Sequence, residues 1–245
     1  MLTCFGTGYI IFVVIKMLIK GFQKLTVLDY PGRTACTVFT GGCNFRCPFC
    51  HNALLVTEQD DVYFDENDIF EHLKKRKNLL DGVAVTGGEP LLQKDIERFL
   101  YEIKEMGYAV KLDTNGSFPE KLDGILQLGL VDYVAMDVKN CPEKYGVTIG
   151  VKNFDISVIE KSMELLKSSS VEYEFRTTIT ADFHTIDDIG RLAEWIQGTP
   201  KYFLQNFENS GQLIDENCRG VSRNEMREML EVARKYVPNA ELRGL

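Results

Sequence analysis

The sequence has few of the basic residues that a nucleic-acid-binding protein needs. Its 245 residues include 28 Lys and Arg against 36 Asp and Glu, which gives a formal net charge of −8. The most basic run, residues 74–77, falls at the end of an expected helix, where cations suit the helix dipole. Since no larger basic tract stands out, we expect no nucleic-acid partner.

The sequence also lacks an apolar run long enough to span a membrane. The stretch Thr3–Ile19 is mostly apolar, but it is shorter than the roughly 20 residues that a spanning helix requires. It has no clear basic start or small-residue cleavage site of a signal peptide, so we expect no stable membrane association. Because Met17 opens a plausible alternative start, we regard residues 1–16 as a doubtful N-terminal extension and residues 17–245 as the core domain.

Cysteine is the one unusually distributed residue type. The chain has seven cysteines, an odd number, and three of them fall within eight residues; the seven are Cys4, Cys36, Cys43, Cys47, Cys50, Cys141 and Cys218. A chain of this length needs no disulfide staples, and disulfides could not use all seven. We therefore expect a cytoplasmic, reducing location in which the group of three binds a metal or does redox chemistry.

The remaining sequence alternates between strand and helix patterns, without repeats or linkers. The strands are expected at residues 34–40, 82–86, 109–114, 133–138, 172–179, 201–207 and, last, 240–243. The helices are expected at residues 66–77, 95–106, 119–128, 157–167 and 186–196, with a final helix after Ser222. Repeated β–α units predict parallel strands, and six units favour an α/β fold of the partial (β/α)6 TIM-like barrel type. A doubly wound sheet is the alternative, and either fold places reactive residues at the carboxyl ends of the strands.

The three clustered cysteines follow the first expected strand at the spacing C-x3-C-x2-C. Cys43, Cys47 and Cys50 can surround one small site and leave one ligand position open. A 4Fe–4S cluster held this way keeps one iron free to bind a cofactor, which suits catalysis. A structural zinc site that takes His51 or Cys36 as its fourth ligand is the less favoured interpretation.

Polar residues recur where the next strands end. Two glycines in Gly87-Gly88-Glu89-Pro90 allow a backbone to approach a ligand closely. Asp113 and Asp137, at two later strand ends, could share a cation, and Lys139 could neutralise a carboxylate. Arg176, within an apolar strand, must have a partner or face a ligand. Gln205 could face the same pocket, His184 is expected to be an ordinary loop residue, and Cys141 and Cys218 form no second cluster.

Together these motifs resemble the radical S-adenosylmethionine (SAM) superfamily. The resemblance implies a 4Fe–4S cluster on the three cysteines, whose open iron chelates SAM, and reductive cleavage of SAM to a 5′-deoxyadenosyl radical. It also implies that the backbone around Phe49 contacts the adenine and that Gly87, Gly88 and Glu89 hold the SAM amino group.

Two further motifs, Asp113-Thr114-Asn115-Gly116 and Asp137-Val138-Lys139, are similar to those of the glycyl-radical activating enzymes. This resemblance implies that Lys139 contacts the SAM carboxylate and that Asp113 and Asp137 hold a possible monovalent cation. It also implies that Arg176 contacts the SAM ribose or carboxylate. A structural salt bridge is the alternative for Arg176.

Residues 17–244 resemble the longer form of the anaerobic ribonucleoside-triphosphate reductase activating protein. This resemblance rests on Asp29-Tyr30-Pro31-Gly32, Cys50-His51-Asn52, and residues 173–178 and 204–207. It implies a glycyl radical enzyme as partner and a flavodoxin- or ferredoxin-like electron donor. The alternatives are another activase, a radical SAM enzyme that acts on a small molecule (for example, a deazaguanine-forming synthase), or a non-enzymatic iron–sulfur or zinc protein.

Overall fold

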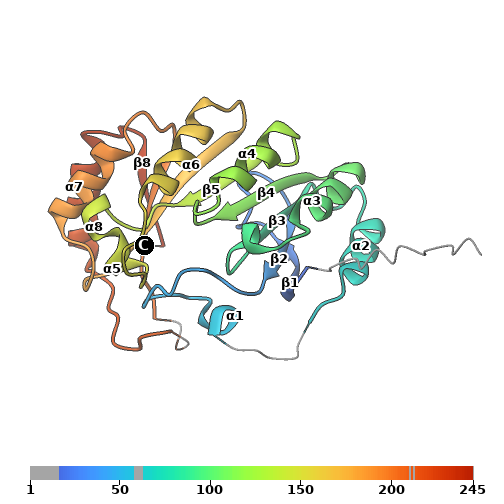
Figure 1. Ribbon diagram of the computed structural model, residues 1–245, viewed down its shortest axis with the longest axis horizontal. Helices are drawn as coiled ribbons and strands as arrows, with labels where there is room; N and C mark the ends of the chain where they lie inside the picture. Colours follow the sequence, from blue (N-terminus) through green and yellow to red (C-terminus); the bar gives the residue numbers. More distant parts are fainter. Residues whose placement is uncertain (1–16, 58–62, 210, 212, 245) are drawn as a thin grey trace, which may run out of the picture.

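Eight strands form a single curved sheet in which the order along the sheet follows the order along the chain (Figure 1). The computed structural model describes residues 17–57, 63–209, 211 and 213–244. The predicted extension over residues 1–16, with Cys4, lies outside these residues. The strands are β1 (Ile19–Thr26), β2 (Ala35–Thr40), β3 (Gly82–Gly87), β4 (Ala109–Thr114), β5 (Tyr133–Asp137), β6 (Glu172–Ile179), β7 (Tyr202–Asn206) and β8 (Ala240–Arg243).

The pairing of these strands makes an open barrel. β1 pairs with β2 in the antiparallel sense, and every later neighbour, from β2–β3 to β7–β8, is parallel. Among the described residues β8 does not pair with β1, so the barrel is not closed. A doubly wound sheet would reverse its strand order partway along, and the sequential order therefore excludes that alternative. The partial TIM-like barrel is confirmed.

The helices connect the strands, and the longer ones lie along the outside of the sheet (Figure 1). They are α1 (Ala53–Thr57), α2 (Glu66–Lys75), the 3-10 helix η1 (Pro90–Leu92), α3 (Ile96–Glu105), α4 (Pro119–Gln127), α5 (Pro142–Thr148), α6 (Ser157–Ser168), α7 (Ile186–Trp195) and α8 (Arg223–Arg234). α3 shows why they pack there: Ile96, Phe99, Leu100 and Ile103 recur at helical spacing and are buried.

Most predicted boundaries agree with the structure to within two residues. The capping box at Ser222 and Glu225 is present at the start of α8, and the last strand covers the predicted residues 240–243. The prediction missed β1, α1, η1 and α5. β1 carries three consecutive exposed residues and two bulges, which obscure the alternation that marks a strand.

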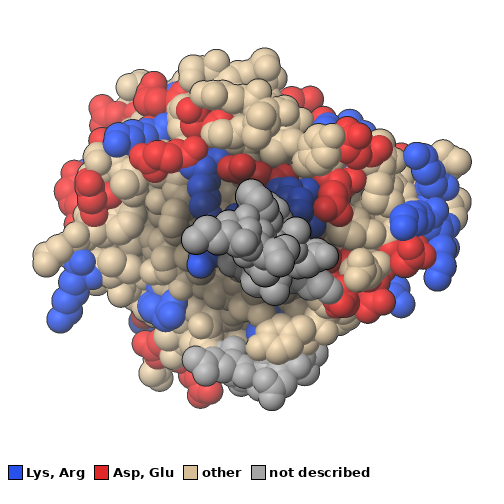
Figure 2. Space-filling model, turned by 45° about the vertical axis from the view of Figure 1, so that its right-hand side comes forward, with Lys and Arg blue, Asp and Glu red and all other residues tan. Residues whose placement is uncertain are grey.

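The core fills the space between sheet and helices and leaves the carboxyl ends of the strands to polar residues. Apolar side chains of the central strands, such as Val85, Leu112, Val134 and Met136, are fully buried. Among the described residues, no helix combines the length and hydrophobicity needed to cross a membrane. On the face shown in Figure 2, Lys and Arg side chains are interspersed with Asp and Glu.

Candidate active site

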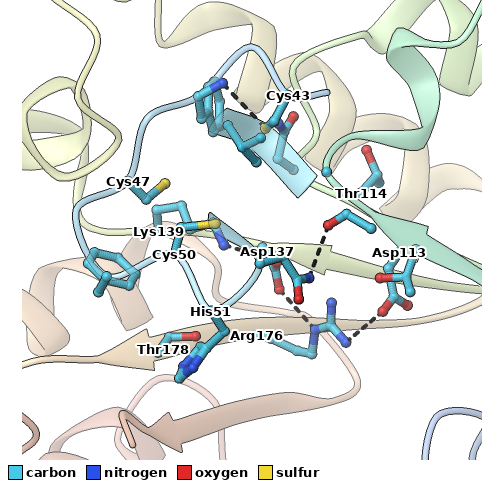
Figure 3. Close-up of a pocket in the computed structure, with 18 of the residues that line it drawn as sticks. Cys43, Cys47, Cys50, His51, Asp113, Thr114, Asp137, Lys139, Arg176 and Thr178 are labelled. Atoms are coloured by element: carbon cyan, nitrogen blue, oxygen red, sulfur yellow. Dashed lines mark hydrogen bonds and ion pairs between the residues drawn. The ribbon is translucent and has the colours of Figure 1, made fainter. Parts of the chain in front are cut away.

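A cavity of about 260 Å³ opens at the carboxyl ends of strands β2–β7 (Figure 3). Each strand contributes through its last residues or through the loop that follows it, as the parallel order requires. Among its lining residues are Cys43, Phe49, Cys47, Cys50, Gly87, Gly88, Asp113, Asp137, Lys139, Arg176, Thr178 and Gln205. The cavity lining thus includes nine of the ten residues to which we assigned catalytic or cofactor roles, and it also includes Asp137. The tenth residue, Glu89, does not line the cavity.

The three clustered cysteines lie in the cysteine loop, residues 41–52, which follows β2. Cys47 is buried, while Cys43 and Cys50 are half-buried, and all three line the cavity. Each thiolate of a 4Fe–4S cluster binds a different iron, so three thiols that line one cavity fit three of the four irons of such a cluster.

Burial makes these thiols reluctant to ionise without a cation. It raises the pKa of Cys47 to about 12, although Lys139 works in the opposite direction, and it also raises the pKa values of Cys43 and Cys50. Metal binding requires the thiolate, and a coordinated metal supplies the charge that deprotonates it. This environment fits cysteines that ionise when metal binds and stay protonated otherwise.

Hydrogen bonds from four other parts of the chain fix the cysteine loop. The Arg46 N–H donates to the carbonyl of Ile149 (2.8 Å), and the Pro48 carbonyl accepts from Asp215 (2.9 Å). The Asn52 side chain donates to the Gly87 carbonyl at 3.1 Å. The side chain of Asn44 donates to the Ser117 hydroxyl (2.9 Å) and accepts from Asn115 (3.0 Å). None of these bonds passes through a cysteine thiol, so these particular bonds do not depend on a ligand on the sulfurs.

The two glycines at the end of β3 allow this loop to pack against the strand. A Cβ at Gly88 would lie 1.8 Å from the carbonyl oxygen of Gly42, and the N–H of Glu89 donates to that same oxygen at 2.8 Å. Gly87 has φ +123°, and a Cβ there would lie 2.3 Å from the backbone of Thr40. The close approach expected at these glycines is thus made by the cysteine loop and by β2.

Glu89 supports the junction of the end of β3 with the cysteine loop from inside the protein; we call this junction the β3 corner. It is fully buried; its Oε1 accepts from the Leu91 N–H (3.0 Å) and the Thr114 hydroxyl (2.8 Å), and its Oε2 from the Asn115 N–H (2.7 Å). Burial raises the pKa of Glu89 to about 7, even though these bonds act to lower it. Because the side chain is turned inward, contact of this residue with a ligand would have to come from its backbone.

Five charged side chains alternate in sign across the strand ends β4, β5 and β6, and we call them the charge ladder. Figure 3 labels four of them, Asp113, Arg176, Asp137 and Lys139. Lys111 pairs with Asp113, whose other oxygen lies 3.2 Å from Arg176 Nη1. Arg176 Nε donates to Asp137 at 2.9 Å, and Lys139 Nζ donates to the second oxygen of Asp137 at 3.0 Å. The salt bridges that were one interpretation of Arg176 are therefore present.

The ladder keeps both carboxylates ionised. Burial alone would raise their pKa values, but Arg176 and Lys139 lower the pKa of Asp137 to about 2, and Arg176 with Lys111 holds the pKa of Asp113 below its ordinary value. Burial would likewise lower the pKa of Lys139, which Asp137 and Cys47 raise above its usual range. Asp113, Asp137 and Lys139 are thus charged near neutral pH, and the cation Lys139 faces the cavity.

Aromatic and polar neighbours complete the wall. The buried ring of Phe49 lies 5.7 Å from that of Phe183 and 6.3 Å from His184. His184 is buried, and its ring nitrogens lie 2.8 Å from the Lys139 carbonyl and 3.2 Å from the Thr180 N–H. It therefore contacts the Lys139 backbone from the loop after β6.

Gln205 does line the cavity, opposite Thr178 in the β6–β7 register. The cysteines predicted to be ordinary thiols, Cys36, Cys141 and Cys218, are buried and do not line the cavity.

Comparison with known proteins decides the family. Residues 37–196 match the model of the radical SAM superfamily, and this range contains the cysteine loop and the whole charge ladder. The chain belongs to the radical SAM superfamily. Enzymes of this superfamily use a 4Fe–4S cluster together with SAM, and these are the cofactors of this enzyme.

Curated relatives of this radical SAM enzyme include activating enzymes. A Methanocaldococcus jannaschii protein named "Putative glycyl-radical enzyme activating enzyme" is 32% identical over 244 residues, which covers 94% of this chain and 97% of that protein. The pyruvate formate-lyase-activating enzyme of Listeria monocytogenes is 28% identical over 195 residues, which covers 74% of this chain and 77% of the relative.

Solved structures share the fold of this radical SAM enzyme at low sequence identity. Streptococcus suis SuiB bound to S-adenosylmethionine is 16% identical with a TM-score of 0.64, over 83% of this chain and 48% of SuiB. Escherichia coli QueE is 14% identical with a TM-score of 0.54, over 94% of both chains. These similarities support the partial barrel and carry no information on the substrate.

Sequence reasoning missed several residues that shape the site of this radical SAM enzyme. Lys111 received no role, although a lysine two residues before Asp113 must share its face of the strand. Asn44, Asn52, Asn115 and Ser117 were also given no role in the site, because a polar side chain that fastens one loop to another has no signature in sequence spacing.

Proposed function

We propose that this enzyme cleaves SAM reductively at a 4Fe–4S cluster held by Cys43, Cys47 and Cys50, and that it generates a glycyl radical on a partner enzyme. The observation that carries the proposal is the full-length similarity to a protein named as a glycyl-radical enzyme activating enzyme. The three thiols around one cavity support the cluster assignment. The six cysteines among the described residues are all free thiols, which favours the cytoplasm as the location.

The chain's own residues have distinct tasks in this proposal. When bound, the cluster and SAM supply one-electron cleavage of the C5′–S bond and hence a 5′-deoxyadenosyl radical. Lys139, at the cavity end of the charge ladder, neutralises the SAM carboxylate, and Arg176 holds both aspartates in place.

Other parts of the wall would bind and shield SAM. The carbonyls at Gly87 and Gly88 accept from its amino group, and the backbone around Phe49 contacts its adenine. The buried aromatic wall around Phe49 keeps water away from the reacting atoms.

As partner we propose an anaerobic ribonucleoside-triphosphate reductase, with a flavodoxin- or ferredoxin-like protein as the electron donor. Support for this choice comes from the sequence motifs at residues 29–32, 50–52 and 204–207. A glycine in a loop of the partner suits the chemistry, because its two flanking amides delocalise the spin left when an α-hydrogen is removed. The barrel is open, since β8 and β1 are not paired among the described residues, and such an opening can admit a loop of another protein.

The cluster assignment is tested by single substitutions in anaerobically reconstituted protein. Cys43→Ala, Cys47→Ala and Cys50→Ala should each abolish conversion of SAM to 5′-deoxyadenosine. Cys36→Ala, a buried thiol in β2, is the matched control and should retain it. A colourless wild-type protein that binds zinc and leaves SAM intact would refute the enzyme assignment.

The partner is tested by electron paramagnetic resonance of a candidate reductase mixed with this enzyme, SAM and a reductant. We expect the doublet of a glycyl radical, and a reductase with alanine at its radical glycine should show none. SAM cleavage without a doublet on any candidate glycyl radical enzyme would instead favour a small-molecule substrate, such as that of a deazaguanine-forming synthase.

A further inference from the structure

Each carboxylate oxygen of the two ladder aspartates already has a side-chain cation beside it. The two oxygens of Asp113 accept from Lys111 and Arg176, and the two oxygens of Asp137 accept from Arg176 and Lys139. Three side-chain cations thus face two carboxylates. The monovalent cation suggested for Asp113 and Asp137 by family resemblance does not fit this arrangement, because it would add positive charge where cations already outnumber carboxylates.

Lys111 supplies the second cation beside Asp113. Its side chain is 3% exposed, and Asp113 is its only ion-pair partner among the described residues. Lys111 and Asp113 lie two residues apart on β4, so their side chains leave the same face of the strand. A buried ammonium needs a nearby negative charge, and a half-buried aspartate gains from a nearby positive one. Each residue meets the requirement of the other.

The charge count of the ladder suits a single carboxylate ligand. Lys111, Arg176 and Lys139 carry three positive charges, and Asp113 and Asp137 carry two negative charges, so one positive charge is left over. The sequence of pairs places the outer cation at Lys139, which lines the cavity (Figure 3). One bound carboxylate brings the ladder to neutrality.

We propose that the Lys111 ammonium stands in for a monovalent metal ion, so that the carboxylate of SAM binds to the ladder without added sodium or potassium. This inference rests on the proposed function only in taking SAM as the occupant of the cavity. Lys111 acts as a positioning residue: it holds Asp113, which holds Arg176, which in turn fixes Asp137 and Lys139. Without it, Asp113 would keep Arg176 as its single cation and would require another.

The test is SAM binding to the cluster-loaded enzyme, measured anaerobically by equilibrium dialysis. The salts are potassium, sodium and choline chloride at one concentration, so that ionic strength stays constant. For the wild type we expect dissociation constants that agree within about twofold in all three salts. For Lys111→Met we expect binding about tenfold weaker in choline chloride, with most of the loss recovered in potassium or sodium chloride.

Two variants act as controls. Lys111→Arg keeps a cation beside Asp113 and should remain independent of the salt. Lys104→Met removes a lysine of α3 that pairs with Asp132 at the surface, and it should bind SAM as the wild type does in every salt.

SAM binding by the wild type in the three salts tests the role of Lys111 even if the variants do not fold. Wild-type binding that requires potassium or sodium would overturn the inference and leave the proposed function intact. Equal binding by Lys111→Met and the wild type in choline chloride would also overturn it. Wild-type protein that binds SAM in none of the salts would refute the assignment of the cavity itself.

Discussion

Two neighbouring parts of the cavity rim solve the problem of a buried carboxyl group in different ways. At the end of β3, Glu89 has no ion-pair partner in the part of the chain that the structure describes and is held by three hydrogen-bond donors, so burial raises its pKa to about 7. In the charge ladder, Asp113 and Asp137 meet cations directly, and their pKa values are lowered. The first arrangement fastens backbone segments together, and the second keeps charge available to a ligand.

The sharpest test of the β3 corner is Gly88→Ala. The added Cβ would lie 1.8 Å from the Gly42 carbonyl, a contact that only displacement of the cysteine loop can relieve. We expect nearly complete loss of cluster binding, measured as iron and sulfide per chain after anaerobic reconstitution.

Gly124→Ala is the matched control for this substitution, because the nearest atom to its Cβ is a Glu97 side-chain oxygen at 3.6 Å. In helix α4 it should bind the full cluster and gain roughly 0.5–1 kcal/mol of stability. Full cluster content in Gly88→Ala would show that the packing of the loop against β3 is dispensable.

A smaller but still large effect is expected from Asp137→Asn in the charge ladder. The change leaves Arg176 and Lys139 each without one charged partner in a buried setting. We expect the free energy of unfolding to fall by about 3 kcal/mol at pH 8, as measured by urea denaturation. A loss comparable with that of an exposed pair, such as Lys74 with Glu71 after Glu71→Gln, would show that the ladder contributes little to stability.

Glu89→Gln should change the dependence of stability on pH. The folded-state pKa of Glu89 is raised from 4.5 to about 7, so between these values the folded state holds a proton that the unfolded state has lost. Stability from this group is therefore greatest below pH 4.5 and declines as the pH rises toward 7, by roughly 3 kcal/mol in total.

This decline should be absent from Glu89→Gln, and the difference between the two proteins isolates it from other titrating groups. Parallel curves of unfolding free energy for the wild type and Glu89→Gln between pH 4.5 and 7 would contradict the assigned environment of Glu89.

The smallest effect is expected where the corner and the cysteine loop meet through amides. Asn115 donates to Asn44 and lies 3.8 Å from the Cys43 sulfur, to which the Phe45 N–H also donates at 3.4 Å. Hydrogen bonds to cluster sulfurs raise the reduction potential. Asn115→Ala should therefore make the cluster slightly harder to reduce, as followed by redox titration. A potential equal to that of the wild type would limit Asn115 to a mechanical role.

The sequence predicted the barrel and most of its cavity because periodic strands and the cysteine spacing are local signals. Cys43, Cys47 and Cys50 could be placed at one site from their spacing in a single loop, and Asp113, Asp137 and Lys139 could be placed there from their positions at strand ends. Strand β1 could not be predicted, because its bulges and exposed residues leave no alternation of apolar and polar residues.

The contacts between loops could not be predicted from the sequence for a different reason. The Gly42 carbonyl meets Gly88 across 46 residues of sequence, and only the folded arrangement shows that this contact, rather than a ligand, requires the glycine. Lys111 had a signal in its two-residue spacing from Asp113, but nothing in the sequence shows whether that lysine turns toward solvent or into the barrel.

The anchoring of the cysteine loop also bears on what happens after oxygen damage. Exposed clusters with an open iron are easily oxidised and lost. Since Arg46, Pro48 and Asn52 hold the loop through bonds that involve no sulfur, these bonds remain when the iron is gone. We therefore expect the cluster-free protein to keep the backbone path of the cysteine loop, so that restoring the cluster requires iron, sulfide and electrons but no refolding of the chain.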